Sequence, residues 1–295
     1  PGWLKDSGHW RERVSEIEDR LSNALHTSLT QRFVDRRGSM LARRNEDDLI
    51  ASVDASGRVL VEGEYVGELR EFDFLPDPTA HGDEQKTLVA AARKVLAGEI
   101  ETRAAKFAEI NDTELSFQPG QLDCPPSVVY RGRTLARIVR GPDTLSPTIQ
   151  LLGNELLTGS DRLRVENRLT RWLHDHLRRH LAPLFRLREK SDAALDANAR
   201  GIAFQMSEHL GAISRRTIAK QLTSVSREGR RSLRSCGVEI GEHSVYMPAL
   251  LKPAPARLRF ELWRLQHGHG GLAAAPDPGL MSIPVEADIP EDLYA

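Results

Sequence analysis

Val59-Leu-Val-Glu-Gly-Glu-Tyr-Val-Gly-Glu-Leu69 and Val128-Val-Tyr-Arg-Gly-Arg-Thr-Leu-Ala-Arg-Ile138 align with each other at a constant offset of 69 residues. In both stretches apolar and polar residues alternate around a glycine, which is the pattern of an antiparallel hairpin with a tight turn. A helical pattern follows each of them, over 83–108 and 161–181. We therefore expect an α+β fold, mostly helical, with two small antiparallel β-meanders that form a possible repeat. Short hairpins also resemble one another by chance, so the repeat is a hypothesis with that alternative beside it.

Four regions follow from the hydrophobic pattern and the distribution of charge. The chain has 295 residues, 40% of them hydrophobic, which is enough for one large core or two modest ones. Apolar residues recur every three or four positions over 10–44, which predicts a long helix. The expected regions are an N-terminal long helix or helix pair (1–47), a duplicated β-meander plus helix region (48–190), a basic helical region (191–266) and an acidic, Pro-rich tail (267–295).

The basic helical region predicts three short helices followed by two short strands. Ser214 and Ser226 stand where N-caps of the second and third helices are expected, and Gly237 stands just past the third helix. Strands are expected over 238–240 and 244–246. This order is compatible with a helix-turn-helix or winged-helix arrangement, so we expect a winged-helix-like C-terminal part.

The net charge of −1 conceals a strong segregation of charge along the chain. Residues 45–118 hold 17 acidic and 7 basic residues, whereas residues 201–264 hold 11 basic and 5 acidic ones. Local basic fields, rather than net charge, attract phosphates. We therefore expect a nucleic-acid interface, with Arg259 extending it. The candidate nucleic-acid-binding residues are Arg131, Arg133, Arg137, Arg140, Arg215, Arg216, Lys220, Arg227, Arg230, Arg231, Arg234, Lys252 and Arg257.

Two alternatives apply to these basic residues. They could form a merely solvated surface, or they could pair with the acidic first hairpin and the acidic tail. Only 5% of the chain is aromatic, so backbone contact is favoured over base stacking on an aromatic platform. Helix N-termini could also receive a phosphate oxygen.

Motifs for catalysis are missing from the sequence. It contains no Gly-x-x-x-x-Gly-Lys-Ser/Thr phosphate loop, no Asp-Glu-x-His/Asp run and no Gly-x-Ser-x-Gly elbow. His174-Asp175-His176 could belong to a metal site, but it lacks further ligands and neighbouring arginines would repel a cation. The His267-Gly-His269 pair lacks a third ligand. We therefore predict no catalytic residue, no metal ligand and no cofactor in this chain.

The composition leads to expectations about the cellular compartment and about membrane spans. The chain has no apolar window of about 18 residues, so no membrane span or membrane partner is expected. Cys124 and Cys236 form neither a disulfide framework nor a metal motif, which fits a cytoplasmic protein. The first residue is not Met, which leads us to expect a fragment.

The run Gly237–Trp263, Gly-Val-Glu-Ile-Gly-Glu-His-Ser-Val-Tyr-Met-Pro-Ala-Leu-Leu-Lys-Pro-Ala-Pro-Ala-Arg-Leu-Arg-Phe-Glu-Leu-Trp, resembles the C-terminal region of bacterial superfamily 2 helicases related to the mitochondrial degradosome RNA helicase. The segments Leu25–Arg37 and Gly57–Leu69 are similar to the same family. In that family this region follows two RecA-like motor lobes, which this chain lacks. The resemblance implies ATP and Mg for the motor, with no matched ATP-contacting residue here.

We accordingly expect a non-catalytic C-terminal accessory region of an ATP-dependent bacterial helicase. Its expected partners are single- or double-stranded nucleic acid, DNA or RNA, and the motor lobes in cis. One alternative is a protein-interaction scaffold, whose basic helices would be covered by its own acidic residues. The other is a metal-dependent hydrolase using His174, Asp175 and His176, which requires those three side chains to converge in a pocket.

Overall fold

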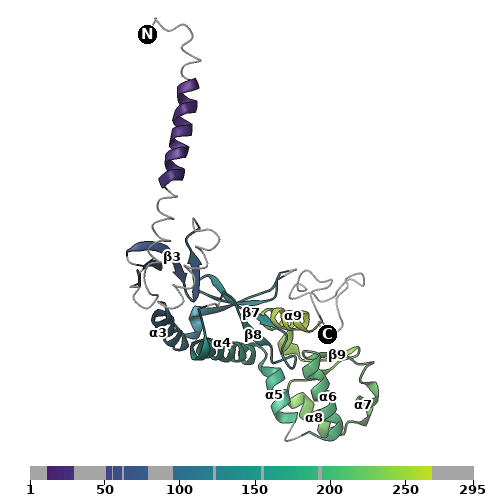
Figure 1. The fold of residues 1–295 in the computed structure, drawn as a ribbon. Coiled ribbons are helices and arrows are strands. Elements are labelled where there is room, and N and C mark those ends of the chain that lie inside the picture. The colour runs from purple at the N-terminus through teal and green to yellow at the C-terminus, as the bar shows by residue number, and fades with distance from the viewer. Residues whose placement is uncertain are drawn as a thin grey trace, which may run out of the picture. The chain divides into compact units, whose positions relative to one another are not determined.

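The fold is α+β, as the sequence predicts, with small antiparallel sheets and a larger share of helix (Figure 1). The structure is a computed structural model. The residues that it describes are 12–29, 51–54, 56–61, 63–78, 96–121, 124–153, 156–191 and 195–267. The chain forms two compact units. The first comprises Pro1–Lys106 and Gly153–Arg162, and the second comprises Phe107–Leu152 and Leu163–Ala295.

The first unit holds the first β-meander. Its strands are β1 (Ala51–Val53), β2 (Arg58–Val61), β3 (Glu64–Arg70) and β4 (Asp73–Pro76), each paired antiparallel with the next. The meander buries apolar side chains such as Val59 and Leu69. Arg103 of α3 (Ala97–Ala108) donates from Nη1 to the backbone oxygen of Glu71 at 3.1 Å, so a side-chain hydrogen bond ties this helix to the sheet.

The second β-meander lies in the second unit and repeats the strand pairing of the first. Its strands are β5 (Leu115–Gln118), β6 (Ser127–Tyr130), β7 (Arg133–Val139) and β8 (Thr148–Leu151). Each residue pair between β2 and β3 recurs 69 positions later between β6 and β7; Val59↔Gly67, for example, corresponds to Val128↔Ala136. The register shift of a β-bulge recurs at the same place. Both meanders are thus confirmed, although the sequence grouped them in one region.

A glycine shapes the turn at the same place in each hairpin. Gly63 has φ +84° and Gly132 has φ +77°. Such left-handed backbone favours glycine because a side chain would meet the neighbouring carbonyl. The alternation of the flanking residues and these two glycines are the reason that the chain forms the same hairpin twice.

Helix α4 (Gly159–His180) buries an apolar stripe along one side. The stripe includes Val165, Leu169, Trp172 and Leu177. The helix continues after a break into α5 (Ala182–Ser191). The predicted helix over 161–181 is therefore confirmed within two residues.

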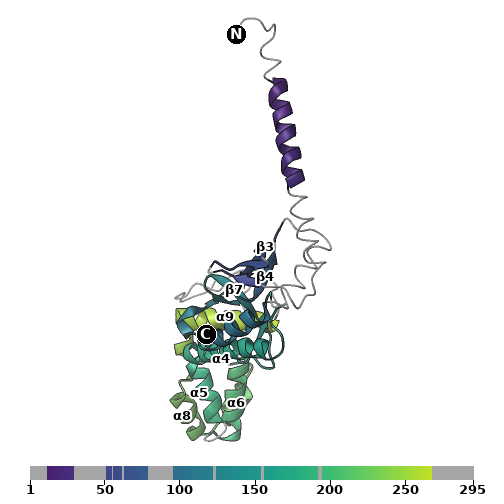
Figure 2. The same cartoon turned by 60° about the vertical axis from the view of Figure 1, so that its left-hand side comes forward.

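The remainder of the second unit has the element order helix, strand, helix, helix, strand, strand. The elements are α6 (Ala197–Glu208), β9 (Ala212–Ser214), α7 (Ala219–Ser224), α8 (Arg227–Ser235), β10 (Glu239–Ile240) and β11 (Ser244–Tyr246). The three strands form an antiparallel sheet of order β10-β11-β9. Helix α6 lies beside α5 and α8 in both views (Figures 1 and 2). The short 3₁₀ helix η3 (Pro248–Leu251) and α9 (Pro253–His267) complete this part.

Capping residues set both ends of α8 but not the start of α7. Ser226 caps α8, since its hydroxyl accepts from the backbone N–H of Gly229 at 2.9 Å, and Gly237 follows the helix with φ +87°. Both expectations are confirmed. The expected cap at Ser214 is wrong: this residue ends β9, paired with Ser244 of β11, and α7 begins only at Ala219. Cross-strand pairing prevailed over the local capping preference.

Some sequence-based expectations fall on residues outside the described ranges. Of the long helix predicted over 10–44, residues 12–29 are described and are helical, with exposed side chains. The continuation to 44, the first part of the helix predicted over 83–108 and the tail after residue 267 lie outside the description. Among the described residues, no helix has the length and apolarity needed to cross a membrane.

Candidate nucleic-acid interface

All thirteen candidate basic residues are exposed. They come from three places: β7 and the turns beside it, the segment from β9 to the end of α8, and the start of α9 with the residue before it. Among the described residues, only Arg131 of the thirteen takes part in an ion pair, a loose one of 3.9 Å with Glu114. The described carboxylates therefore form no ion pair with the other twelve candidate residues.

The arginines of the second β-meander surround its tight turn. Arg131 and Arg133 flank Gly132, and Arg137 lies between the buried Ala136 and Ile138. The guanidinium of Arg131 also lies over the Tyr130 ring, 4.9 Å from its centroid. Arg140 is exposed just after the strand ends. The outward face of this hairpin is thus basic, whereas the sequence of the first hairpin carries glutamates.

Helix α8 presents the densest group of candidate residues. Arg227, Arg230, Arg231 and Arg234 are exposed, while Leu233 is fully buried on the other side of the helix. Arg230 donates from Nη2 to the backbone oxygen of Leu222 at 2.8 Å, which restrains its guanidinium. The other three arginines project from positions i, i+4 and i+7, so they share one helix face.

The candidates between β9 and α8 do not share a helix face. Arg215 and Arg216 lie in the turn between β9 and α7, and only Lys220 is helical. Arg215 donates from Nη1 to the backbone oxygen of Gly241 at 3.0 Å, which links this turn to the β10–β11 hairpin. Lys252 and Arg257 are exposed near the start of α9.

Arg259 was expected to extend the basic strip, and this expectation is wrong. Its side chain is 1% exposed, and its Nε donates to the backbone oxygen of Leu210 at 2.6 Å. A buried guanidinium is tolerated only where its donors are satisfied. The helical period of α9 turns this residue inward together with Phe260 and Leu262, which are 3% exposed.

The N-terminus of α8 is occupied by side chains of the chain itself. The Ser226 hydroxyl donates to Asp196 Oδ2 at 2.6 Å, and Asp196 also caps α6 by accepting from the backbone N–H of Ala199 at 2.7 Å. These hydrogen bonds, with that of Ser226 the strongest, lower the pKa of Asp196 below its usual range. A phosphate would therefore meet the arginines of α8 rather than its N-terminus.

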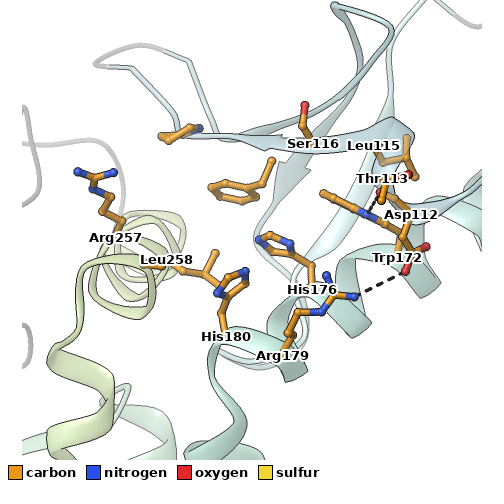
Figure 3. Close-up of a pocket in the computed structure, with 13 residues that line it drawn as sticks. Asp112, Thr113, Leu115, Ser116, Trp172, His176, Arg179, His180, Arg257 and Leu258 are labelled. Atoms are coloured by element: carbon orange, nitrogen blue, oxygen red, sulfur yellow. Dashed lines mark hydrogen bonds and ion pairs between the residues drawn. The ribbon is translucent and has the colours of Figure 1, made fainter.

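A pocket of about 520 Å³ lies among η2 (Asp112–Glu114), β5, α4 and α9 in the second unit (Figure 3). The sequence reasoning did not find it. The residues that line it are Asp112, Thr113, Leu115, Ser116, Phe117, Pro119, Trp172, His176, Arg179, His180, Ala254, Arg257 and Leu258.

Aromatic and imidazole rings form much of the pocket wall. His176 stacks on Trp172 with 5.1 Å between ring centroids and on Phe117 with 5.5 Å, and its centroid lies 4.6 Å from that of His180. Burial, and secondarily the charges of His180 and Arg179, lowers the pKa of His176 to about 4. The His176 ring is therefore neutral at pH 7.

Asp112 fixes the end of the pocket nearest to β5. Its Oδ1 accepts from Nη2 of the buried Arg168 at 2.7 Å, and its backbone oxygen accepts from Trp172 Nε1 at 3.2 Å. Arg179 approaches Asp112 Oδ2 only to 3.8 Å and remains exposed (Figure 3). Two guanidinium groups, those of Arg168 and Arg179, thus share the single carboxylate of Asp112, which leaves a net positive charge at this end of the pocket.

The His-Asp-His sequence does not converge on this pocket. His174 Nδ1 lies 3.5 Å from Asp175 Oδ1, and both side chains are about half exposed. Only His176 of the three lines the pocket. Within the described part of the chain, no group of three His, Cys, Asp or Glu side chains is placed to hold a metal ion. His267 stacks on Trp263, and His269 lies outside the described residues.

One sequence signal could have indicated the pocket. Trp172, His176 and His180 are spaced by four residues, so they form a row along one face of α4. Nothing local in the sequence indicates that Phe117 and Arg257 face this row, because they come from segments far away along the chain. Comparisons of the sequence and the structure with protein-family models, curated proteins and solved structures found no match.

Proposed function

We propose that this chain is a non-catalytic, nucleic-acid-binding accessory region of an ATP-dependent helicase, contacting the DNA or RNA strand beside the motor lobes. The observation that carries this proposal is the exposed face of α8, with three arginines free of ion pairs among the described residues. Arginine contacts to phosphate oxygens position a protein on a strand without reading its sequence.

The topology around α8 supports the same proposal. A helix, a strand, two helices and a terminal hairpin, in which the last strand pairs with the first, is the element order of winged-helix domains. We propose that residues 197–246 are such a domain. In helix-turn-helix proteins the second helix of the pair enters the major groove, and α8 is the second helix here. That assignment brings its arginines to the nucleic acid.

The helicase assignment rests on the resemblance of Gly237–Trp263. In the structure this run comprises β10, β11, η3 and most of α9. ATP and Mg would bind the motor lobes, and no residue of this chain is assigned to either. The same assignment makes the motor lobes a partner in cis and the cytoplasm the expected location.

Fluorescence anisotropy of labelled single strands and duplexes, titrated at several salt concentrations, tests the proposal. We expect binding that weakens steeply as salt rises. The double substitution Arg227→Glu and Arg231→Glu should weaken binding without unfolding the chain, because both side chains are exposed on the shared face of α8. The matched control is Arg13→Glu with Arg20→Glu, which makes the same charge change on exposed positions of the helix over 12–29. No binding at low salt, or equal losses in both variants, would refute the proposed interface.

A protein-interaction scaffold is the second candidate. It requires the basic helices to be covered by acidic residues of the chain, and the described carboxylates leave α8 uncovered. The acidic tail over 268–295 lies outside the described residues. Covering of α8 by that tail stays a prediction of the scaffold hypothesis, and the anisotropy titration decides between the two functions.

A further inference from the structure

The pocket beside α4 combines ring surfaces with cations. Four ring-bearing residues from two elements line it: Phe117 on β5, and Trp172, His176 and His180 on α4. The pocket volume, about 520 Å³, falls in the range of small-ligand sites. Trp172 is 4% exposed and stacks with His176, which also stacks with Phe117, so the half-buried rings of Phe117, His176 and His180 form the accessible ring surface. Such a surface favours a planar ring as ligand, because an aromatic side chain can stack on the π-face of any nucleobase.

The charges at the pocket select an anionic ligand. Arg179 and Arg257 line it from α4 and α9, and both are exposed (Figure 3). Asp112 is the one carboxylate among the described lining residues, and the buried Arg168 pairs with it at 2.7 Å. The field at the pocket is therefore positive. Arg179 also approaches Asp112, at 3.8 Å, so one carboxylate faces two guanidinium groups there and a net positive charge remains. A peptide aromatic ring would fill the space but would supply no anion for that charge or for Arg257.

Hydroxyl groups complete the set of contacts. Thr113 and Ser116 line the pocket and are exposed, so their hydroxyls can donate to or accept from a ligand. A planar ring that carries polar edges and an attached phosphate matches the rings, the hydroxyls and the cations together.

We propose that this pocket binds a single unpaired nucleotide, with its base against the ring row of α4 and its phosphate against Arg179 or Arg257. For a nucleotide within a strand, this inference rests on the proposed function. A free mononucleotide has the same chemistry, so the source is decided by experiment. Stacking of one base on such rings changes affinity by roughly five- to 150-fold.

The test uses the full chain and two labelled single strands. One strand carries 4-thiouridine at one position, and the other carries 2-aminopurine. We expect cross-links to the peptide that contains Trp172–His180 and quenching of 2-aminopurine on binding. His180→Ala should remove the quenching and weaken binding at least fivefold. His180 is only half-buried, so its truncation spares the core. The matched control is His174→Ala on the same helix, at an exposed position that does not line the pocket.

The outcomes separate this inference from the proposed function. Binding that depends on Arg227 and Arg231 but gives neither cross-links nor a His180→Ala effect overturns the pocket and leaves the α8 interface intact. If adenosine monophosphate binds, His180→Ala weakens it and no strand binds, the pocket stands as a mononucleotide site and the strand-binding function falls. Absence of all binding overturns both proposals.

Discussion

Removing the three arginines that share the outer face of α8 is the most direct perturbation of the proposed interface. Arg227, Arg231 and Arg234 are exposed, and within the described residues none of them forms an ion pair. A solvated guanidinium about 4 Å from a phosphate contributes about 1 kcal/mol. Replacing all three with alanine should therefore weaken binding by on the order of 100-fold, since about 1.4 kcal/mol corresponds to a factor of ten.

The salt dependence gives a second and more specific readout of the same variant. Each lost phosphate contact lowers the slope of log K against log salt by about 0.7 to 0.9, so the triple variant should lose about 2 to 3. Anisotropy titrations across salt concentrations measure this slope. Thermal unfolding should change little, because exposed substitutions typically alter stability by at most about 0.5 kcal/mol. The control variant replaces Arg13, Arg20 and Arg186 together with alanine. If the α8 variant keeps the wild-type slope of log K against log salt, the reasoning is refuted.

Three further predictions concern stability and pH. Asp196→Ala should destabilise the chain by about 1 kcal/mol above pH 5, because it removes the N-cap of α6. Since the pKa of Asp196 is lowered in the fold, the part of this difference that depends on its charge should decline as pH falls from about 4 through that lowered pKa, measured by denaturant unfolding of both proteins. His176→Phe should make the stability of the fold less sensitive to acid. With a pKa of about 4, His176 stays neutral in the fold while the unfolded chain binds a proton, so wild-type stability falls as the pH drops from about 6.5 towards 4. Equal pH profiles of the two proteins in thermal melts would contradict this. Gly132→Ala should cost about 1 to 2 kcal/mol because φ is +77°, whereas Gly98→Ala inside α3 should stabilise, and calorimetry that finds equal effects would reject the backbone argument.

The parts of the fold that were predictable are those governed by local pattern. Alternating apolar residues and the turn glycine placed both hairpins within a residue or two, and Ser226 and Gly237 marked the two ends of α8. Ser214 failed as a marker because a strand far along the sequence pairs with it. A capping residue identifies a helix start only when no sheet partner competes for the same backbone.

The candidate site shows the same division. Charge clustering identified thirteen basic residues, and the structure places all of them on the surface. It could not show that Arg259 is turned inward to Leu210, nor that the buried Arg168 forms an ion pair with Asp112. Residues 112–119, 172–180 and 254–258 meet in the pocket only through tertiary packing. No single segment carries that information.

The two hairpins with identical register show that backbone architecture and surface chemistry were specified by different residues. Inward apolar side chains and one glycine determine the pairing in both copies, so the outward positions were free to acquire opposite charge. Transplanting the outward residues from one copy to the other would consequently relocate a polyanion-attracting patch without redesigning a strand. Such a duplicated framework lets a protein change its surface contacts while its strand pairing stays constant.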